Sequence, residues 1–244
     1  MSFDLSGRRA LVTGSTRGIG LALARALAAA GACVAINGRT PETVAGVAAA
    51  IDGAVAAPFD VTNEEEIGRA IAAHGPIDIL VNNTGMTVRT ALVDLEPQLW
   101  RHLLDVNLTS AFLVSRAAAP AMIDRGGGKI VNVCSLMSEL ARPTTAAYAA
   151  TKGGLKMLTR SMCAEWALHG IQANGIAPGY FRTDLTQPLQ VDAAFDAWLR
   201  ARVPAGRWGD PDELGGAVVF LASSASDFVN GQVIVVDGGL SAVV

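Results

Sequence analysis

The sequence predicts an α/β fold in which helices cover both faces of a mostly parallel, seven-stranded sheet. Short β-branched runs alternate with longer alanine-rich segments along the 244 residues. That alternation is typical of βαβ units, whose right-handed crossovers leave few topologies. Hydrophobic residues make up 51% of the chain and charged residues 17%. This composition suits strands that are buried on both faces, subunit interfaces, or both.

Each strand is predicted from a short apolar run and each helix from a longer alanine-rich stretch. The predicted strands are Arg9–Thr13, Cys33–Asn37, Val55–Pro58, Ile79–Asn82, Lys129–Cys134, Gln172–Ile176 and Val233–Asp237. The predicted helices are Ala22–Ala30, Glu42–Ala50, Glu64–Ala73, Gln98–Asp124, Ala147–His169 and Asp212–Ala222. No linker rich in Pro, Gly or Ser divides the chain, so a single doubly wound domain is predicted.

The least regular stretch runs from Pro178 to about Pro204 and contains an aromatic, helix-like piece with Phe195 and Trp198. It lies between a strand end and the next helix, which is where loops over a binding site commonly occur. We therefore predict a substrate lid at about residues 180–205. A packed surface excursion is the alternative.

The charge and the cysteine pattern exclude several classes of protein. The net charge is -3 and there is no basic stripe or tail, which argues against binding to nucleic acid or to an anionic membrane surface. The three cysteines and the three histidines are isolated, so neither a disulfide framework nor a metal site is predicted. The start, Met1–Asp4, lacks a signal pattern, and no uninterrupted apolar run looks long enough to span a bilayer. The cytoplasm is the simplest expected location.

A glycine-rich turn follows the first predicted strand. The segment Thr13-Gly14-Ser15-Thr16-Arg17-Gly18-Ile19-Gly20 joins that strand to a helix, which is the context of dinucleotide-binding turns. Gly14 lets the chain turn, and Gly18 and Gly20 let the backbone approach a pyrophosphate. The helix start adds N–H donors and a partial positive charge. A plain structural turn is the alternative, but position and spacing favour nucleotide binding.

The end of the second predicted strand bears on which nicotinamide cofactor is used. A chain that binds NAD carries an acid there for the ribose hydroxyls, whereas this one reads Ile36-Asn37-Gly38-Arg39. Arg39 and Arg17 supply two guanidiniums that suit a 2′-phosphate. The sequence therefore predicts NADP(H) in preference to NAD(H). After the third strand, Asp60-Val61 places a carboxylate for the adenine amino group or caps the following helix.

Tyr148 and Lys152 are four residues apart, with Ser135 upstream. In a helix this spacing places the phenol and the ammonium on one face, and the lysine charge is expected to lower the pKa of the phenol. A hydroxyl such as that of Ser135 can orient a carbonyl oxygen, so the three groups suit a carbonyl/alcohol interconversion. Taken alone, the pattern is also typical of a half-buried tyrosine beside a solvated lysine.

Taken in order, the motifs resemble those of the short-chain dehydrogenase/reductase family over the whole chain. They are the glycine turn, Asn82-Asn83-Thr84-Gly85, Asn107, Ser135, Tyr148-x-x-x-Lys152 and Pro178-Gly179. The resemblance implies a single Rossmann domain over residues 1–244 and hydride transfer with a nicotinamide cofactor. Thr84 departs from the family pattern, which usually has Ala there.

The resemblance also implies roles for individual residues. Tyr148 is expected to be the general acid/base, with Lys152 lowering its pKa and binding the nicotinamide ribose. Ser135 is expected to hold the substrate oxygen, and Asn107 to anchor a water that links Lys152 to solvent. The further cofactor contacts that it implies are Asn83, Thr84, Gly85, Pro178, Gly179, Phe181 and Thr183.

The loops around this site resemble the branch of the family that interconverts D-gluconate and 5-keto-D-gluconate. The distinctive segments are Ser138-Glu139-Leu140-Ala141-Arg142 and Arg207-Trp208-Gly209-Asp210-Pro211. A sugar acid needs a cation for its carboxylate, and ligands bind at the carboxyl ends of strands, where these loops are expected. Arg89, Glu139 and Arg142 are therefore the candidate substrate residues, with Arg89 the first choice for the carboxylate. A surface salt bridge is the alternative for each arginine.

Other functions share parts of this pattern. A 3-oxoacyl carrier-protein reductase or another polyol or sugar dehydrogenase would carry the same catalytic residues. A non-catalytic nucleotide-binding sensor on the same fold would typically lack the tyrosine or the lysine. The family also suggests a homotetramer, and the apolar helices Gln98–Asp124 and Ala147–His169 and the tail Leu240–Val244 are consistent with one.

Overall fold

The computed structural model describes residues 3–243, so Met1, Ser2 and Val244 lie outside the described part. Its centre is a seven-stranded sheet with the order β3-β2-β1-β4-β5-β6-β7, and every neighbouring pair is parallel. The strands are β1 (Arg9–Val12), β2 (Cys33–Gly38), β3 (Val55–Pro58), β4 (Ile79–Asn82), β5 (Gly128–Val133), β6 (Ile171–Pro178) and β7 (Val233–Val236). The predicted fold class is confirmed. The strand order reverses between β1 and β4, and ligands bind at such a point in open α/β sheets.

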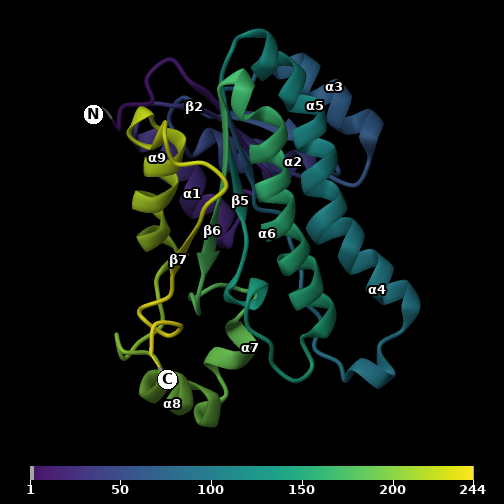
Figure 1. The fold of residues 1–244 in the computed structure, drawn as a ribbon, viewed down its shortest axis with the longest axis vertical. Coiled ribbons are helices and arrows are strands. Elements are labelled where there is room, and N and C mark those ends of the chain that lie inside the picture. Colours follow the sequence, from purple (N-terminus) through teal and green to yellow (C-terminus); the bar gives the residue numbers. More distant parts are fainter. Residues whose placement is uncertain (1–2, 244) are drawn as a thin grey trace.

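Helices cover both faces of the sheet (Figure 1). One layer consists of α1 (Gly18–Ala29), α2 (Pro41–Ala49) and α9 (Gly215–Ala222), and the other of α3 (Glu64–His74), α5 (Ser110–Asp124) and α6 (Ala146–Trp166). Successive strand side chains point to opposite faces. In β1, Val12 accordingly joins the core of the first layer and Leu11 that of the second.

The stretch predicted as one helix, Gln98–Asp124, consists of three consecutive helical pieces. These are α4 (Pro97–Leu104), a π-helical turn (Asp105–Thr109) and α5. Contrary to the sequence-based expectation, this run of 28 residues is long and apolar enough to cross a membrane by length and composition. Its inner side chains Val114, Ala118 and Met122 are buried against the sheet. The apolar face therefore belongs to the core of the fold.

Several helix ends differ from the prediction because glycine and proline turns form the first or last turn. Helix α1 begins at Gly18 rather than Ala22, so the glycine turn leads directly into it. A 3₁₀ turn (Pro211–Leu214) precedes α9, and Ala167–His169 forms another after α6. Gly170, with φ 75°, then reverses the chain into β6.

The segment predicted as a lid contains two short helices, α7 (Gln187–Gln190) and α8 (Ala193–Arg202). Figure 1 shows both helices at the end of the molecule beyond β6. A small apolar cluster holds α8 to the body of the protein through Leu136, Leu199, Val203 and Trp208. The indole of Trp208 also donates a hydrogen bond to Asp196 at 2.7 Å.

Candidate active site

The predicted site residues gather at the carboxyl ends of the strands. The glycine turn follows β1, Arg39 follows β2, and Asp60 follows β3. Asn83–Gly85 follows β4, Ser135 follows β5, and Gly179 follows β6. Because all the strands are parallel, these ends lie along one edge of the sheet. The structure thus brings residues from six separate loops to one side of the molecule.

The glycine turn leaves the start of α1 open to an anion. Gly14 and Gly18 adopt φ values of 61° and 54°, which L-residues with side chains rarely adopt. The first turn of α1 has no acidic residue, and no side chain caps its N–H groups. Unpaired N–H donors and the helix dipole together favour a phosphate at this position. The residues present therefore fit the pyrophosphate of a dinucleotide.

The loop after β4 holds the glycine turn in place. The Asn83 side chain donates to the carbonyl oxygens of Thr13 and Gly14 at 2.9 and 3.1 Å, and its backbone N–H donates to Thr13 Oγ1 at 2.9 Å. A Cβ on Gly20 would lie only 2.4 Å from both Asn83 Nδ2 and the Gly14 carbonyl oxygen. Gly20 is therefore required for the close packing of α1 against these two loops.

Arg39 and Asp60 lie near each other on the far side of the glycine turn. Burial raises the pKa of Asp60, but hydrogen bonds from Thr62 and the charges of Arg39 and His102 hold that pKa below its usual value. The carboxylate accepts from the Thr62 N–H and hydroxyl at 2.8 and 2.7 Å, while Asn63 caps α3. Asp60 therefore stabilises a local turn through Thr62. The N-cap of α3 is Asn63 and not Asp60, which was the alternative role predicted for Asp60.

Some predicted cofactor residues have side chains that face the protein core. Ser15 and Asn37 are 0% and 1% exposed, and both are hydrogen-bonded inside the glycine turn. Val61 and Phe181 belong to the two large apolar clusters. The side chains at these four positions are therefore buried in the protein and not open to a ligand. Arg17, by contrast, is largely exposed and lies 3.8 Å from Asp184 of the segment after β6.

Thr84, the departure from the family pattern, packs its hydroxyl against the glycine turn. Its Oγ1 is buried and has no hydrogen-bond partner, and it would lie 2.9 Å from a Cβ placed on Gly14. A buried hydroxyl without a partner is a net cost to stability.

The catalytic candidates come together between β5 and α6. Ser135 lies two residues beyond the end of β5, and its hydroxyl accepts from the Met137 N–H at 3.1 Å. Tyr148 and Lys152 lie one turn apart on α6, and the Lys152 ammonium is 5.8 Å from the centre of the Tyr148 ring. Lys152 is 3% exposed and donates to the Val133 carbonyl oxygen at 2.6 Å.

Burial is the largest influence on the pKa values of both Tyr148 and Lys152. The sequence predicts a lowered phenol pKa, and the structure corrects that expectation. Burial raises the pKa of Tyr148 above its ordinary value, while a hydrogen bond with Ser135 acts in the opposite direction. Burial also lowers the pKa of Lys152 to about 8. The expectation was wrong because it counted the lysine charge and not the loss of water from both groups.

Asn107 lies in the π-helical turn and joins the catalytic helix to the loop after β4. Its side chain accepts from the Met86 N–H and donates to the Met86 carbonyl oxygen, both at 2.8 Å. It also donates to Thr151 Oγ1, next to Lys152, at 3.1 Å. A Cβ on Gly85 would lie 3.5 Å from both Asn107 Oδ1 and Lys152 Nζ, so these groups surround one small space.

The three candidate substrate residues have different surroundings. Arg89 is exposed on the loop after β4, and within residues 3–243 no carboxylate pairs with it. Glu139 forms an ion pair of 2.7 Å with Lys156 of α6. The Arg142 guanidinium lies 4.9 Å from the Phe195 ring and 5.0 Å from the Trp198 ring, and it donates to the Tyr180 hydroxyl. Arg89 is thus the most accessible cation for a carboxylate.

The sequence reasoning missed the aromatic cluster that receives Arg142. Tyr180, Phe195, Trp198 and Trp208 pack edge-on or tilted, with ring centres 5.2 to 6.3 Å apart. The aromatic residues near 195 were a visible signal, but nothing in the sequence paired them with a residue more than fifty positions earlier. Arg142 thereby joins the catalytic loop to the lid segment.

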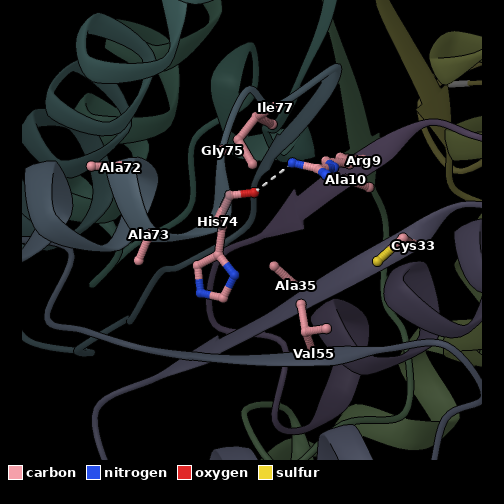
Figure 2. Close-up of a pocket in the computed structure, with 10 residues that line it drawn as sticks. All are labelled: Arg9, Ala10, Cys33, Ala35, Val55, Ala72, Ala73, His74, Gly75 and Ile77. Atoms are coloured by element: carbon pink, nitrogen blue, oxygen red, sulfur yellow. Dashed lines mark hydrogen bonds between the residues drawn. The ribbon is translucent and has the colours of Figure 1, made fainter.

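A cavity of about 350 Å³ lies at the opposite, amino end of the strands (Figure 2). It is lined by Arg9, Ala10, Cys33, Ala35, Val55, Ala72, Ala73, His74, Gly75 and Ile77. The Arg9 guanidinium donates to the His74 carbonyl oxygen at 3.0 Å, and burial lowers the pKa of the His74 ring. No predicted catalytic or cofactor residue lines it. Across residues 3–243, no three His, Cys, Asp or Glu side chains come together as metal ligands.

Comparisons with known proteins extend over nearly the whole chain. A family model described as enoyl-(acyl carrier protein) reductase matches residues 14–241. The chain belongs to the short-chain dehydrogenase/reductase family. As a member of this family it is an oxidoreductase, and the resemblance seen in the sequence motifs is confirmed.

Several members of the short-chain dehydrogenase/reductase family are similar to the chain over nearly their whole length. The chain is 50% identical to the gluconate 5-dehydrogenase of Gluconobacter oxydans over 98% of this chain and 96% of the relative. It is also 50% identical to the 5-keto-D-gluconate 5-reductase of Escherichia coli, over 98% and 97% of the two chains. A solved gluconate 5-dehydrogenase from Burkholderia cenocepacia, in complex with NADP and tartrate, is 56% identical, with a TM-score of 0.96 over 99% and 98% of the chains.

Proposed function

We propose that this short-chain dehydrogenase/reductase interconverts D-gluconate and 5-keto-D-gluconate with NADP(H). The observation that carries the proposal is the convergence of Ser135, Tyr148 and Lys152 with the glycine turn at one edge of the sheet. Relatives about half identical to the chain are named for this reaction, and one of them binds NADP. The same relatives make a carrier-protein substrate the weaker alternative.

The chain's own residues supply the proton and the orientation. The reduced nicotinamide that these residues would hold would supply the hydride for the ketone carbon. The Tyr148 phenol gives its proton to the ketone oxygen, and the raised pKa keeps that proton in place until it is needed. Ser135 holds the same oxygen through its hydroxyl. Lys152 binds the nicotinamide ribose and, with Asn107, restores the proton of Tyr148 through a water.

The preference for NADP(H) over NAD(H) rests on two arginines and a missing acid. Asn37 occupies the last part of β2 and Arg39 follows it, while Arg17 is exposed at the start of α1. These cations suit a 2′-phosphate, and no carboxylate at the end of β2 competes for the ribose hydroxyls. The remaining cofactor contacts proposed are the backbone of the glycine turn, Asp60, Asn83–Gly85, Pro178, Gly179 and Thr183.

For the substrate, we assign the carboxylate to Arg89. Its guanidinium is exposed and unpaired by any carboxylate in the described residues, whereas the positions of Glu139 and Arg142 are supported by Lys156 and by the aromatic rings. Glu139 and Arg142 then border the site from the loop after Ser135. The segment at about 180–205 is proposed to act as a lid over this site. We also propose that the enzyme is a homotetramer and that it is located in the cytoplasm.

The direct test is a reduction assay with the purified enzyme. With NADPH, 5-keto-D-gluconate is expected to be reduced with a higher kcat/KM than other sugar ketones, and NADPH is expected to exceed NADH. An acyl thioester, such as acetoacetyl-coenzyme A, serves as the competing substrate. Efficient thioester reduction without 5-keto-D-gluconate reduction would overturn the proposal, and equal use of NADH would overturn the cofactor preference alone.

Tyr148→Phe tests the proton donor. The ring stays in place but the proton is lost, so turnover is expected to fall by roughly 10³-fold or more, within the range of general acid catalysis with substrate orientation. NADPH binding, measured by fluorescence titration without substrate, is expected to remain. Substantial turnover by this variant would remove Tyr148 from the acid/base role. Turnover by the wild type that is lost in this variant, with binding retained, would exclude the non-catalytic sensor.

A further inference from the structure

Asn37 is buried at the junction of three chain segments, where no ligand can reach its side chain. It lies in β2 and is 1% exposed. Its Oδ1 accepts from the Gly14 N–H at 3.0 Å, and its Nδ2 donates to the carbonyl oxygens of Ala57 and Phe59, both at 3.1 Å. Both amide donors and one side of the amide oxygen are therefore in use.

The backbone of the same residue completes the junction. The Asn37 N–H donates to Ser15 Oγ at 2.9 Å, and the Ser15 N–H donates back to the Asn37 carbonyl oxygen at 2.9 Å. Ser15 Oγ in turn donates to the Val12 carbonyl oxygen at 2.7 Å. Asn37 thus bonds to the glycine turn through three groups, its Oδ1, its N–H and its carbonyl oxygen, and to the end of β3 through a fourth, its Nδ2.

The segments that Asn37 joins are the ones that would hold the adenosine half of the cofactor. Gly14 opens the turn in front of α1, and Phe59 directly precedes Asp60. Two residues after Asn37 comes Arg39, whose charge reaches Asp60. Gly14 holds a φ of 61°, a conformation that an extra hydrogen bond to its N–H helps to fix.

We propose that Asn37 is a positioning residue for cofactor binding, which acts through Gly14 and the end of β3 rather than by contact. This inference rests on the proposed NADP(H) function. Apolar replacement of Asn37 removes the acceptor of the Gly14 N–H and the amide bonds to the Ala57 and Phe59 carbonyl oxygens, so the turn and the end of β3 lose their common anchor. The adenosine half of the site loosens, while the catalytic groups on β5 and α6 keep their places.

Asn174 offers a matched control at the same burial. It is 1% exposed in β6, donates from Nδ2 to the Val229 carbonyl oxygen at 2.7 Å, and accepts from the Gln232 N–H at 3.0 Å. Asn37→Leu and Asn174→Leu therefore remove comparable buried amide bonds from different places. Both variants are expected to melt at lower temperature than the wild type. Only the first is expected to change cofactor affinity.

The measurement is fluorescence titration with NADPH and competition by adenosine 2′,5′-bisphosphate, which probes the adenosine half alone. Asn37→Leu is expected to raise both Kd values roughly tenfold or more, with kcat at saturating NADPH nearly unchanged. Asn174→Leu is expected to leave both within about twofold. A folded Asn37→Leu variant with wild-type affinity, or an equal loss in Asn174→Leu, would overturn the inference.

Two further experiments distinguish a positioning role of Asn37 from a failure to fold and from a failure of the proposed cofactor. If Asn37→Leu does not fold, Asn37→Ser against Asn174→Ser repeats the comparison with a smaller perturbation. If the wild type binds no NADPH, the proposed cofactor fails, and hydrogen exchange of the Gly14 amide still tests the anchor. Exchange there is expected to accelerate in the Asn37 variant and not in the Asn174 variant, and unchanged exchange would overturn the positioning role.

Discussion

The buried position of Lys152 disfavours the charged form of its side chain. It is 3% exposed, and burial lowers its pKa from 10.5 to about 8. The unfolded chain keeps this proton up to about pH 10.5, while the folded chain releases it near pH 8. Between these values the unfolded state binds more protons, so stability rises with pH through that window. The cost of the buried ammonium is present in full below about pH 8.

Lys152→Met is therefore expected to stabilise the fold near neutral pH while it abolishes turnover. Removing the buried charge is expected to raise the free energy of unfolding by on the order of 2 kcal/mol at about pH 7. Loss of the hydrogen bond from Lys152 to the Val133 carbonyl oxygen offsets part of this gain. The gain should shrink as the pH approaches 10, because the wild-type lysine is then neutral when folded. Urea unfolding at both pH values measures the difference. Lys156→Met, one turn along α6, is the control, and a gain independent of pH would contradict the argument.

The sequence predicts which residues come together as catalytic candidates but not their electrostatics. The spacing of Tyr148 and Lys152 follows from helix geometry, which depends only on neighbours in the chain. The direction of the phenol pKa depends on how completely β5, β6 and the turn Leu136–Ser138 cover α6, and β6 is distant from the tyrosine in sequence. Likewise, Asn37 was predicted to touch the cofactor, since its burial under Ala57 and Phe59 has no local signature.

At the scale of elements, Arg142 adds a polar and aromatic link between the loop after β5 and α8, beside the apolar cluster of Leu136, Leu199, Val203 and Trp208. Arg142 places its guanidinium over the rings of Phe195 and Trp198 of α8 and donates to the Tyr180 hydroxyl, so aromatic residues hold it on several sides. A planar guanidinium can stack in this way, and a lysine ammonium cannot. The docking of α8 is therefore expected to depend on arginine and not on positive charge alone.

Arg142→Lys is expected to loosen α8 while the sheet stays intact. Losing the stacking and the bond to Tyr180 removes about 1–2 kcal/mol, so amide hydrogen exchange in Ala193–Arg202 should accelerate by roughly 5- to 30-fold. Arg116→Lys, which alters a surface pair with Glu64 at 2.5 Å, should leave that exchange unchanged. Unaltered protection of α8 in Arg142→Lys would show that the apolar cluster around Trp208 suffices.

Element boundaries were predictable where local chemistry decides them and not elsewhere. Pro41 and Asn63 mark the starts of α2 and α3 close to where the sequence predicts them. The π-helical turn at Asp105–Thr109 interrupts a run that reads as one helix, because the bonds of Asn107 to Met86 and Thr151 come from other segments. Such turns frequently occur at functional sites, which agrees with the position of Asn107.

At the scale of the whole molecule, apolar side chains remain on the outer faces of α5 and α6. Phe112 is 45% and Met157 58% exposed, and the two helices run side by side on one face of the sheet (Figure 1). At the sheet edge, β7 leaves Val235 42% exposed and has no outer strand to pair with. Apolar helix faces and an open strand edge are what a closed symmetric assembly covers.

The proposed tetramer gives a sharp expectation for the mass in solution. Light scattering is expected to report about four times the 25.1 kDa of one chain. Phe112→Glu combined with Met157→Glu places charges on the helix face, which cannot be buried without partners, so the mass is expected to fall by half or more. Val55→Glu, at the opposite edge of the sheet and 39% exposed, adds a charge without touching that face and should keep the wild-type mass. A wild-type mass of one chain would remove the tetramer, and an unchanged mass in the double variant would move the interface away from α5 and α6.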